Sequence, residues 1–162
     1  MNMDNKILDK INVQMNFELE SAYIYAAMQA WFENEDWNGF AHFMQKQAQE
    51  EMEHAQKMIH YLQERGYAVE YDAIPKPKND YGSIEEVFQA AYDHEKEVTK
   101  NCNDIYLAAK EAKDNASEIF MQWYVMEQVE EEATFDAIIT RLDRIAGSSS
   151  GLYIYNGELG AR

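Results

Sequence analysis

Residues 41–63 read AHFMQKQAQEEMEHAQKMIHYLQ, and their apolar side chains recur at intervals of three and four positions. This is the spacing of one face of an α-helix, and it places Glu51 and His54 on the same stripe as Met44 and Met58. Because residues three apart share a helix face, the carboxylate and the imidazole can bind one ion. Carboxylate oxygen and imidazole nitrogen together suit iron, manganese or zinc. The stretch therefore predicts an amphipathic helix with a pair of metal ligands on its buried face.

Three other segments with helical periodicity also carry an acid on the apolar stripe, namely Glu18, Glu95, and Glu131 in the cluster Glu127-Gln128-Val129-Glu130-Glu131. A lone Glu-x-x-His pair is usually a solvated helix face, and a lone stripe acid usually pairs with lysine or arginine. These stripes, however, contain no basic residue. A buried ionised carboxylate is costly unless it is paired or bound to a metal. The joint pattern predicts an all-α fold with a metal site in the core of a four-helix bundle, the plan of di-iron carboxylate proteins.

The predicted site is uneven. Glu51 lies in the middle of its helix and can bridge two ions, the first completed by Glu18 and His54, the second by Glu95 and Glu131 with Gln128 nearby. A symmetric plan would place a second histidine three residues after Glu131, where this chain has Thr134. The second ion would then have oxygen ligands only. We expect it to be held more loosely, which suits iron that is passed onward.

Composition agrees with a single helical domain over residues 1–162. The chain has 162 residues, 46% of them apolar, with only 7 glycines and 2 prolines. Strong helix formers dominate the rest. The formal net charge of −16 would repel nucleic acid and anionic lipid and attract cations, although by itself it indicates only an acidic surface.

The compartment is predicted from what the sequence lacks. Cys102 is the only cysteine, which excludes a disulfide within the chain. The first ten residues lack the apolar run of a signal peptide, and no stretch approaches the ~18–20 apolar residues of a membrane span. We expect a cytoplasmic protein with no membrane and no nucleic-acid partner.

Local signals divide the chain into a bundle over about residues 4–146 and a C-terminal element over about 148–162. The expected helices run over about 4–33, 36–65, 83–113 and 115–146, with caps at Asp4, Asp36 and Ser83 and a glycine stop at Gly66. Between the second and third helices, Pro75 and Pro77 favour an extended crossover along the bundle.

The tail after Gly147 is predicted to form a brief fifth helix. The run Gly147-Ser-Ser-Ser-Gly151 separates it from the bundle, and Leu152, Ile154 and Leu159 would lack apolar partners in an isolated subunit. We therefore expect the tail to serve assembly rather than chemistry. The alternative is that it folds back onto its own subunit.

Five strings spread along the chain resemble bacterial-type non-haem ferritin: NFELESAYIY (16–25), HFMQKQAQEEMEHAQ (42–56), HEKEVTK (94–100), QWYVMEQVEEEATF (122–135) and GLYIYNGEL (151–159). The resemblance extends over essentially the whole chain, including the crossover with its two prolines. The resemblance implies an up-down-down-up four-helix bundle with one long crossover and a short C-terminal fifth helix. It further implies a homo-oligomeric shell of twenty-four subunits. Such a shell oxidises Fe(II) with dioxygen or peroxide and stores ferric mineral inside.

The resemblance also implies roles for single residues. Glu18, Glu51 and His54 match the first ferroxidase iron, and Glu51, Glu95 and Glu131 match the second, with Gln128 alongside. Tyr25 matches a tyrosine next to this dinuclear centre. Glu50, Glu127 and Glu130 match the acids of a third iron site, although from the residues alone they would be solvated charges on helix flanks.

Two rival functions stay open. Bacterioferritin binds haem through a methionine, and Met52 stands at a matching place, but the missing Glu-x-x-His pair on the last long helix argues against that family, so haem is not expected. A di-iron oxidase acting on an organic substrate would usually need a longer chain and a substrate pocket.

Overall fold

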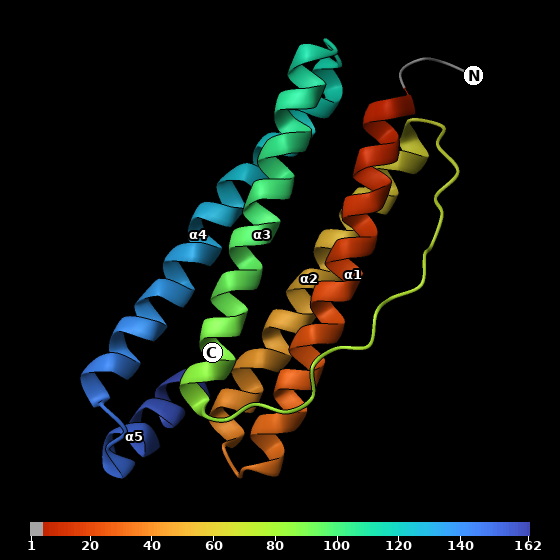
Figure 1. Ribbon diagram of the computed structural model, residues 1–162. Helices are drawn as coiled ribbons and strands as arrows, with labels where there is room; N and C mark the ends of the chain where they lie inside the picture. The colour runs from red at the N-terminus through yellow and green to blue at the C-terminus, as the bar shows by residue number, and fades with distance from the viewer. Residues whose placement is uncertain (1–4) are drawn as a thin grey trace.

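The computed structural model describes residues 5–162, which contain four long helices and one short one (Figure 1). They are α1 (Asn5–Asn34), α2 (Asn38–Glu64), α3 (Ile84–Glu111), α4 (Asn115–Ile145) and α5 (Ser149–Leu159). In Figure 1, α1 and α2 form one antiparallel pair and α3 and α4 another, while α2 and α3 point the same way. The predicted up-down-down-up bundle with a fifth short helix is confirmed.

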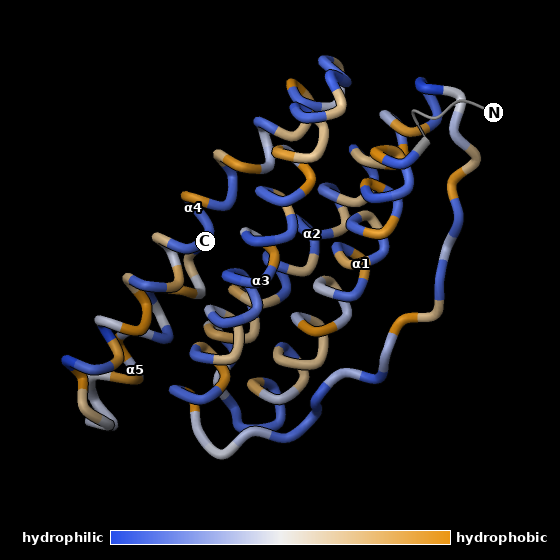
Figure 2. Tube along the Cα trace, turned by 45° about the horizontal axis from the view of Figure 1, so that its top comes forward, coloured by the Kyte–Doolittle hydropathy of each residue, from blue (hydrophilic) through white to orange (hydrophobic). Residues whose placement is uncertain are grey.

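Helical periodicity predicted correctly which side of each helix lies inside. The stripe residues named from the sequence are buried. Tyr61 of α2 and Phe120 of α4, at helical spacing from Met58 and Tyr124, are half-buried and stack with ring centroids 4.0 Å apart. Hydrophobic and hydrophilic residues therefore alternate along each helix in Figure 2. Among the described helices, none is long and apolar enough to cross a membrane.

The core consists of two apolar clusters, one toward each end of the bundle. One cluster is built around aromatic side chains such as Phe32, Phe40 and Phe88. The other contains Ile11 and Met58 among its fully buried residues. The stripe acids lie on the same helices between these clusters, so the bundle has a polar layer with apolar packing on both sides.

The helix ends follow the predictions with one exception. Gly66 has φ 74° two residues after the end of α2, and Ser83 Oγ accepts from the Glu86 amide at 3.2 Å. Asp114, for which no cap was predicted, caps α4. The exception is Asp36, because α2 begins at Asn38 and the N-cap position is Trp37, which makes no side-chain capping bond. Asp36 instead adopts φ 64°, a left-handed conformation that aspartate tolerates in a tight turn. The predicted cap Asp4 lies outside the described residues.

The crossover runs the length of the bundle beside α1 (Figure 1). It has no regular secondary structure, so its backbone groups need other partners. Asn12 donates to the Glu70 carbonyl at 3.1 Å and accepts from the Glu70 amide at 3.0 Å. One turn later, Asn16 accepts from the Asp72 amide at 2.9 Å. Two asparagines on α1 thus fix the path of the chain between the helix pairs.

The fifth helix folds back onto its own bundle. Tyr155 is 6% exposed within the cluster around Phe40, and the Asn156 side chain accepts from the Phe40 amide at 2.9 Å. Leu152 and Leu159 pack against the same cluster, so the expectation that they lack apolar partners is wrong. The cause is the crossing of α5 over the first turn of α2, which the sequence does not reveal.

The approach of α5 to α2 depends on a glycine. A Cβ on Gly39 would lie 1.8 Å from the Asn156 carbonyl oxygen, whereas a Cβ on Gly157 would meet nothing within 4 Å. We expect Gly39→Ala to destabilise the protein by about 1–3 kcal/mol, the usual effect of overpacking. Gly157→Ala should be neutral or stabilising by up to about 1 kcal/mol through helix propensity.

Thermal unfolding and the rate of tail proteolysis would measure both effects. Equal melting temperatures for the two variants would contradict the close α2–α5 contact.

Candidate metal centre

Five buried side chains from all four long helices converge in the polar layer. They are Glu18 on α1, Glu51 and His54 on α2, Glu95 on α3 and Glu131 on α4, each at most 6% exposed. Two sets of three have ligand atoms within 4.8 Å of one another. Glu18, Glu51 and His54 form the first set, and Glu51, Glu95 and Glu131 form the second. Glu51 belongs to both, as the helical spacing predicted.

Four of the converging atoms lack a hydrogen-bond partner. Both carboxylate oxygens of Glu51, one oxygen of Glu18 and Nδ1 of His54 are buried without a hydrogen-bond partner. His54 Nδ1 lies 3.3 Å from a Glu51 oxygen, close enough for both atoms to share an ion. Buried acceptors without partners are costly, and metal coordination removes that cost. The donor set therefore fits a pair of oxygen- and nitrogen-binding metal ions such as iron.

Glu95 is held by donors from two neighbouring helices. The Tyr25 hydroxyl on α1 donates to one of its oxygens at 2.7 Å, and the Gln128 amide on α4 donates to the other at 3.0 Å. Both donors are buried. Such partners orient a metal ligand, so the two residues lie where a positioning role would put them.

Two glutamines hold the carboxylates of Glu18 and Glu131. The sequence did not predict either role. Gln14 donates to Glu18 at 3.3 Å, and Gln47 donates to Glu131 at 3.0 Å. Their common signal is a position one helical turn before a predicted ligand, since Gln14 precedes Glu18 and Gln47 precedes Glu51 by four residues. Spacing alone does not tell that Gln47 crosses to α4.

Burial of several acids in one place favours their protonated forms. Burial, and next the charge of Glu18, raise the pKa of Glu51 well above its usual range. Burial also raises the pKa of Glu95, opposed by the hydrogen bonds from Tyr25 and Gln128. For Glu131, burial and the Glu95 charge raise the pKa to about 8. The metal-free cluster therefore binds protons near neutral pH, and a cation would compete with them.

The three remaining acids of the predicted site lie toward the surface. Glu50 and Glu127 are half-buried and Glu130 is exposed. Burial raises the pKa of Glu127, and the charges of Glu130 and Glu50 add to the effect. Within residues 5–162, these three acids are not among the sets whose ligand atoms lie within 4.8 Å of one another. Glu50 is instead paired with Arg162 at 2.6 Å.

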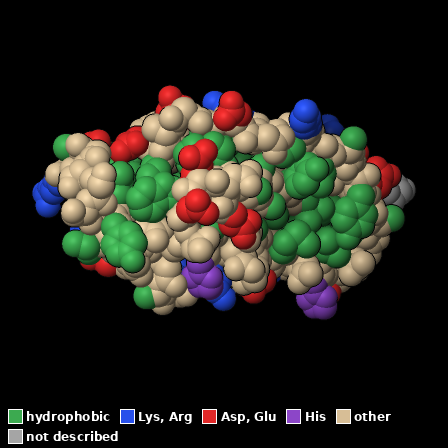
Figure 3. Space-filling view, turned by 90° about the horizontal axis from the view of Figure 1, so that it is seen from below, with side chains coloured by type: hydrophobic (Ala, Val, Ile, Leu, Met, Phe, Trp, Pro, Cys, Tyr) green, Lys and Arg blue, Asp and Glu red, His purple; other side chains and the backbone are tan. Residues whose placement is uncertain are grey.

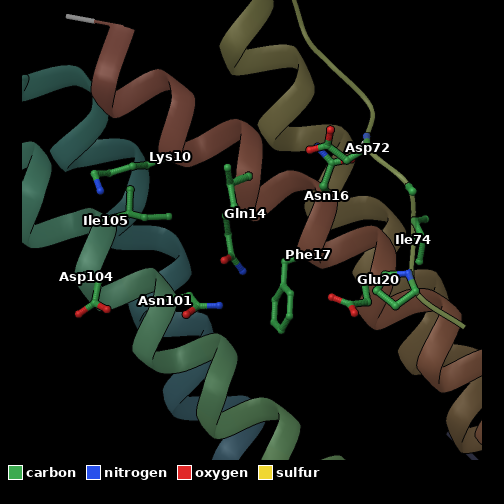
Figure 4. Close-up of a pocket in the computed structure, with 13 residues that line it drawn as sticks. Lys10, Gln14, Asn16, Phe17, Glu20, Asp72, Ile74, Asn101, Asp104 and Ile105 are labelled. Carbon is green, nitrogen blue, oxygen red and sulfur yellow. Dashed lines mark hydrogen bonds between the residues drawn. The ribbon is translucent and has the colours of Figure 1, made fainter. Parts of the chain in front are cut away.

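A separate groove of about 570 Å³ lies between α1, α3 and the crossover (Figure 4). Figure 4 shows Asn101 of α3 pointing toward Gln14 and Phe17 of α1 across it. The five converging side chains do not line this groove. Gln14 connects the two regions, because it lines the groove and also donates to Glu18.

The raised pKa values predict how stability depends on pH. An acid whose pKa is raised on folding binds its proton more tightly in the folded chain, so stability falls as pH rises from the ordinary value through the raised one. For Glu131 this window runs from 4.5 to about 8. We expect the metal-free protein to melt at a lower temperature at pH 8 than at pH 6. A divalent cation should raise the melting temperature more at pH 8, where fewer protons compete.

Scanning calorimetry at the two pH values, with and without Zn²⁺, measures this effect. Glu131→Gln should reduce the pH dependence, because the amide does not titrate. Metal-free protein that melts at the same temperature at both pH values would contradict the proton-binding cluster.

Comparisons with known proteins agree with this geometry. A family model described as a ferritin-like domain matches residues 8–145. The chain is 41% identical over 160 residues to a bacterial non-heme ferritin of Staphylococcus aureus (strain USA300), covering 99% of this chain and 96% of the relative. A protein of the same name from Staphylococcus saprophyticus is 39% identical over 160 residues, with the same coverage.

A solved structure has the same fold. It is an open pore ferritin from the hyperthermophilic archaeon Archaeoglobus fulgidus, which superposes with a TM-score of 0.97 at 37% identity over 99% of each chain. Sequence, fold and the buried carboxylate–histidine cluster all lead to one conclusion: the chain belongs to the ferritin family.

Proposed function

We propose that this ferritin, which stores iron and oxidises Fe(II), does so with five ligands to two iron ions: Glu18, Glu51, His54, Glu95 and Glu131. The observation that carries the assignment is the position of Glu51, which belongs to both sets of converging atoms with neither oxygen hydrogen-bonded. Each oxygen is thus free to bind a different ion. Gln14, Gln47, Tyr25 and Gln128 hold the other carboxylates in place.

The charges of the ligands explain why iron passes through. Four carboxylates balance two Fe(II) ions, which enter as substrates. When dioxygen or peroxide takes up their electrons, the two Fe(III) ions exceed the ligand charge by two. Hydroxide or oxide from water supplies the missing negative charge. The Fe(III) ions then depend less on the carboxylates of the protein for charge balance. Oxidation therefore promotes release toward a mineral.

The two iron positions should differ in retention. His54 gives the first position a nitrogen ligand, whereas the second is surrounded by carboxylates. At the place of a second histidine, the Thr134 hydroxyl donates to the Glu130 carbonyl at 3.0 Å and the side chain is exposed. We propose that the second ion leaves first.

We propose that iron leaving the buried pair next binds a third site, formed by the outer acids Glu50, Glu127 and Glu130. They lie on α2 and α4, next to Glu51, Gln128 and Glu131 along the chain, and outside the buried layer. Burial raises the pKa of Glu127 and the charges of Glu130 and Glu50 raise it further, which supports a shared location. Acids in this position would take up iron as it leaves the buried pair.

A homo-oligomeric shell of twenty-four subunits is proposed as the storage compartment. Large apolar side chains stay exposed on α4 and α5: Ile119, Met126, Val129, Tyr153 and Ile154, each between 61% and 75%. Exposed apolar groups on adjacent elements favour contacts with further subunits. Acidic side chains gather in the middle of the face shown in Figure 3, while basic ones lie at its edges, so the surface would attract Fe(II).

The haem alternative concerns another part of the surface. Met52 is 42% exposed and lines a shallow groove with Leu19 and Tyr23 between α1 and α2. The expectation that haem is not bound stays a prediction, and an absorbance spectrum of the purified protein after addition of haem tests it.

The ligand assignment predicts separate effects on activity and folding. Glu51→Ala and His54→Ala should lower the rate of the fast phase of Fe(II) oxidation by about 100-fold or more, since even the outer partners of metal ligands typically account for about 10- to 100-fold. Helical circular dichroism should persist, because each change removes an unpartnered buried group. Glu53→Ala is the matched control, since Glu53 lies between the two ligands but is exposed. A full-rate Glu51→Ala variant would refute the assignment.

The proposed third iron site predicts a change in the ratio of Fe(II) oxidised to dioxygen consumed. Glu127→Gln and Glu130→Gln should alter the number of Fe(II) ions oxidised per dioxygen consumed, because iron can no longer move past the dinuclear pair. Asp136→Asn, at an exposed position on α4, should leave this ratio unchanged. Oxygen-electrode measurements with known additions of iron give the ratio. If the ratio stays that of the original protein in both glutamate variants, these acids are only solvated charges.

A further inference from the structure

The end of the described chain returns to the metal centre. The chain turns back between α4 and α5, and α5 runs toward the bundle, so that the last residues lie against it (Figure 1). Arg162 donates to Glu50 at 2.6 Å and to the amide oxygen of Gln47. Its guanidinium lies 4.7 Å from the centre of the Phe43 ring, and its carbonyl oxygen lies 3.0 Å from His42 Nε2. Four side chains of α2 thus hold one arginine.

The contact with Gln47 reaches the second iron position through one side chain. Gln47 is 1% exposed, and its amide nitrogen donates to Glu131 at 3.0 Å. An amide has a single acceptor oxygen, and here Arg162 uses it. If the amide turned over, its nitrogen would face the guanidinium and its oxygen would face the carboxylate, both repulsive arrangements. Arg162 therefore fixes the orientation in which Gln47 donates to Glu131.

The contact with Glu50 affects metal binding at the outer acids, Glu50, Glu127 and Glu130. A guanidinium keeps its charge at all accessible pH values, so Glu50 is neutralised whenever the pair is formed. Arg162 bonds one oxygen of Glu50, so a metal ion that binds Glu50 through this oxygen must first displace Arg162. The pair is accessible to water, with side-chain exposures of 29% and 38%, and such pairs are weak. Displacement by a metal cation is therefore feasible.

We propose that Arg162 is a displaceable cap on the dinuclear centre. It positions Gln47 against Glu131, and it occupies Glu50 until an iron ion leaving the second position replaces it. Arg162 is a positioning residue, because its guanidinium bonds Gln47 and Glu50 rather than any of the five proposed ligands of the buried pair. The inference rests on the proposed assignment of Glu131 and Glu50 as iron ligands.

Two substitutions separate the two roles. Arg162→Gln removes the charge from Glu50, so the ion at the outer acids should bind about three- to fivefold more tightly, the scale of an exposed ion pair. Arg162→Lys keeps a charge near Glu50, but an ammonium lacks the planar fork that bonds Gln47 and Glu50 together. In that variant the outer ion should bind as in the original protein, while the second ion of the buried pair binds more weakly.

Anaerobic titration of the assembled protein with Co²⁺ measures both effects, because the visible absorption of Co²⁺ reports the coordination of each ion as it binds. Arg141→Gln is the matched control. Arg141 also pairs with a glutamate, Glu158 of α5, at 3.2 Å and lies over an aromatic ring, but it does not contact Gln47. The Arg141→Gln variant should bind Co²⁺ as the original protein does.

Glu50→Gln separates failure of the cap from failure of the underlying assignment. If Glu50→Gln weakens the outer ion while Arg162→Gln leaves every affinity unchanged, the cap proposal is overturned and the outer site stands. If Co²⁺ does not bind the buried pair of the original protein, the ligand assignment itself fails. A tighter outer ion in Arg162→Gln, with a weaker second ion in Arg162→Lys, supports both roles of Arg162.

Discussion

The burial of four carboxylates with no basic side chain on their stripes is the constraint on which the rest of the structure depends. Glu51 is the extreme case, because it is 1% exposed and neither of its oxygens accepts a hydrogen bond. Such a layer opposes folding unless protons or cations neutralise it. The apolar clusters on both sides of the layer supply the opposing free energy, with fully buried aromatic rings such as Phe32 and Phe88 on one side. The fold is thus a scaffold that holds an unfavourable group of charges in place.

Donors from neighbouring helices then convert that group of charges into a defined geometry. Glu95 of α3 is held by Tyr25 of α1 and Gln128 of α4, and Glu131 of α4 is held by Gln47 of α2. Each of these bonds crosses between helices. A shift of one helix would therefore move a carboxylate as well as the apolar packing, so the same contacts set the helix positions and the geometry of the carboxylate cluster.

The sequence predicted the four inward acids because helical spacing determines which face of a helix a residue occupies. It did not predict cross-helix partners, since a stripe gives a direction but no neighbour. Gln47 shows the difference: it lies one turn before Glu51 on the same stripe, yet it donates to Glu131, 84 residues away. Asp36 shows another limit, because an aspartate suits both an N-cap and a left-handed turn. Only the packing of α1 against α2 decides between them.

The tail shows where separating the chain into structural and chemical parts fails. The Gly-Ser run over residues 147–151 indicated an independent element, yet its last three residues open α5, and one face of that helix places Tyr155 in the core while Tyr153 and Ile154 face outward. Three residues beyond its last turn, Arg162 reaches Gln47 and Glu50. A helix of 11 residues therefore connects an exposed apolar surface to the edge of the metal centre.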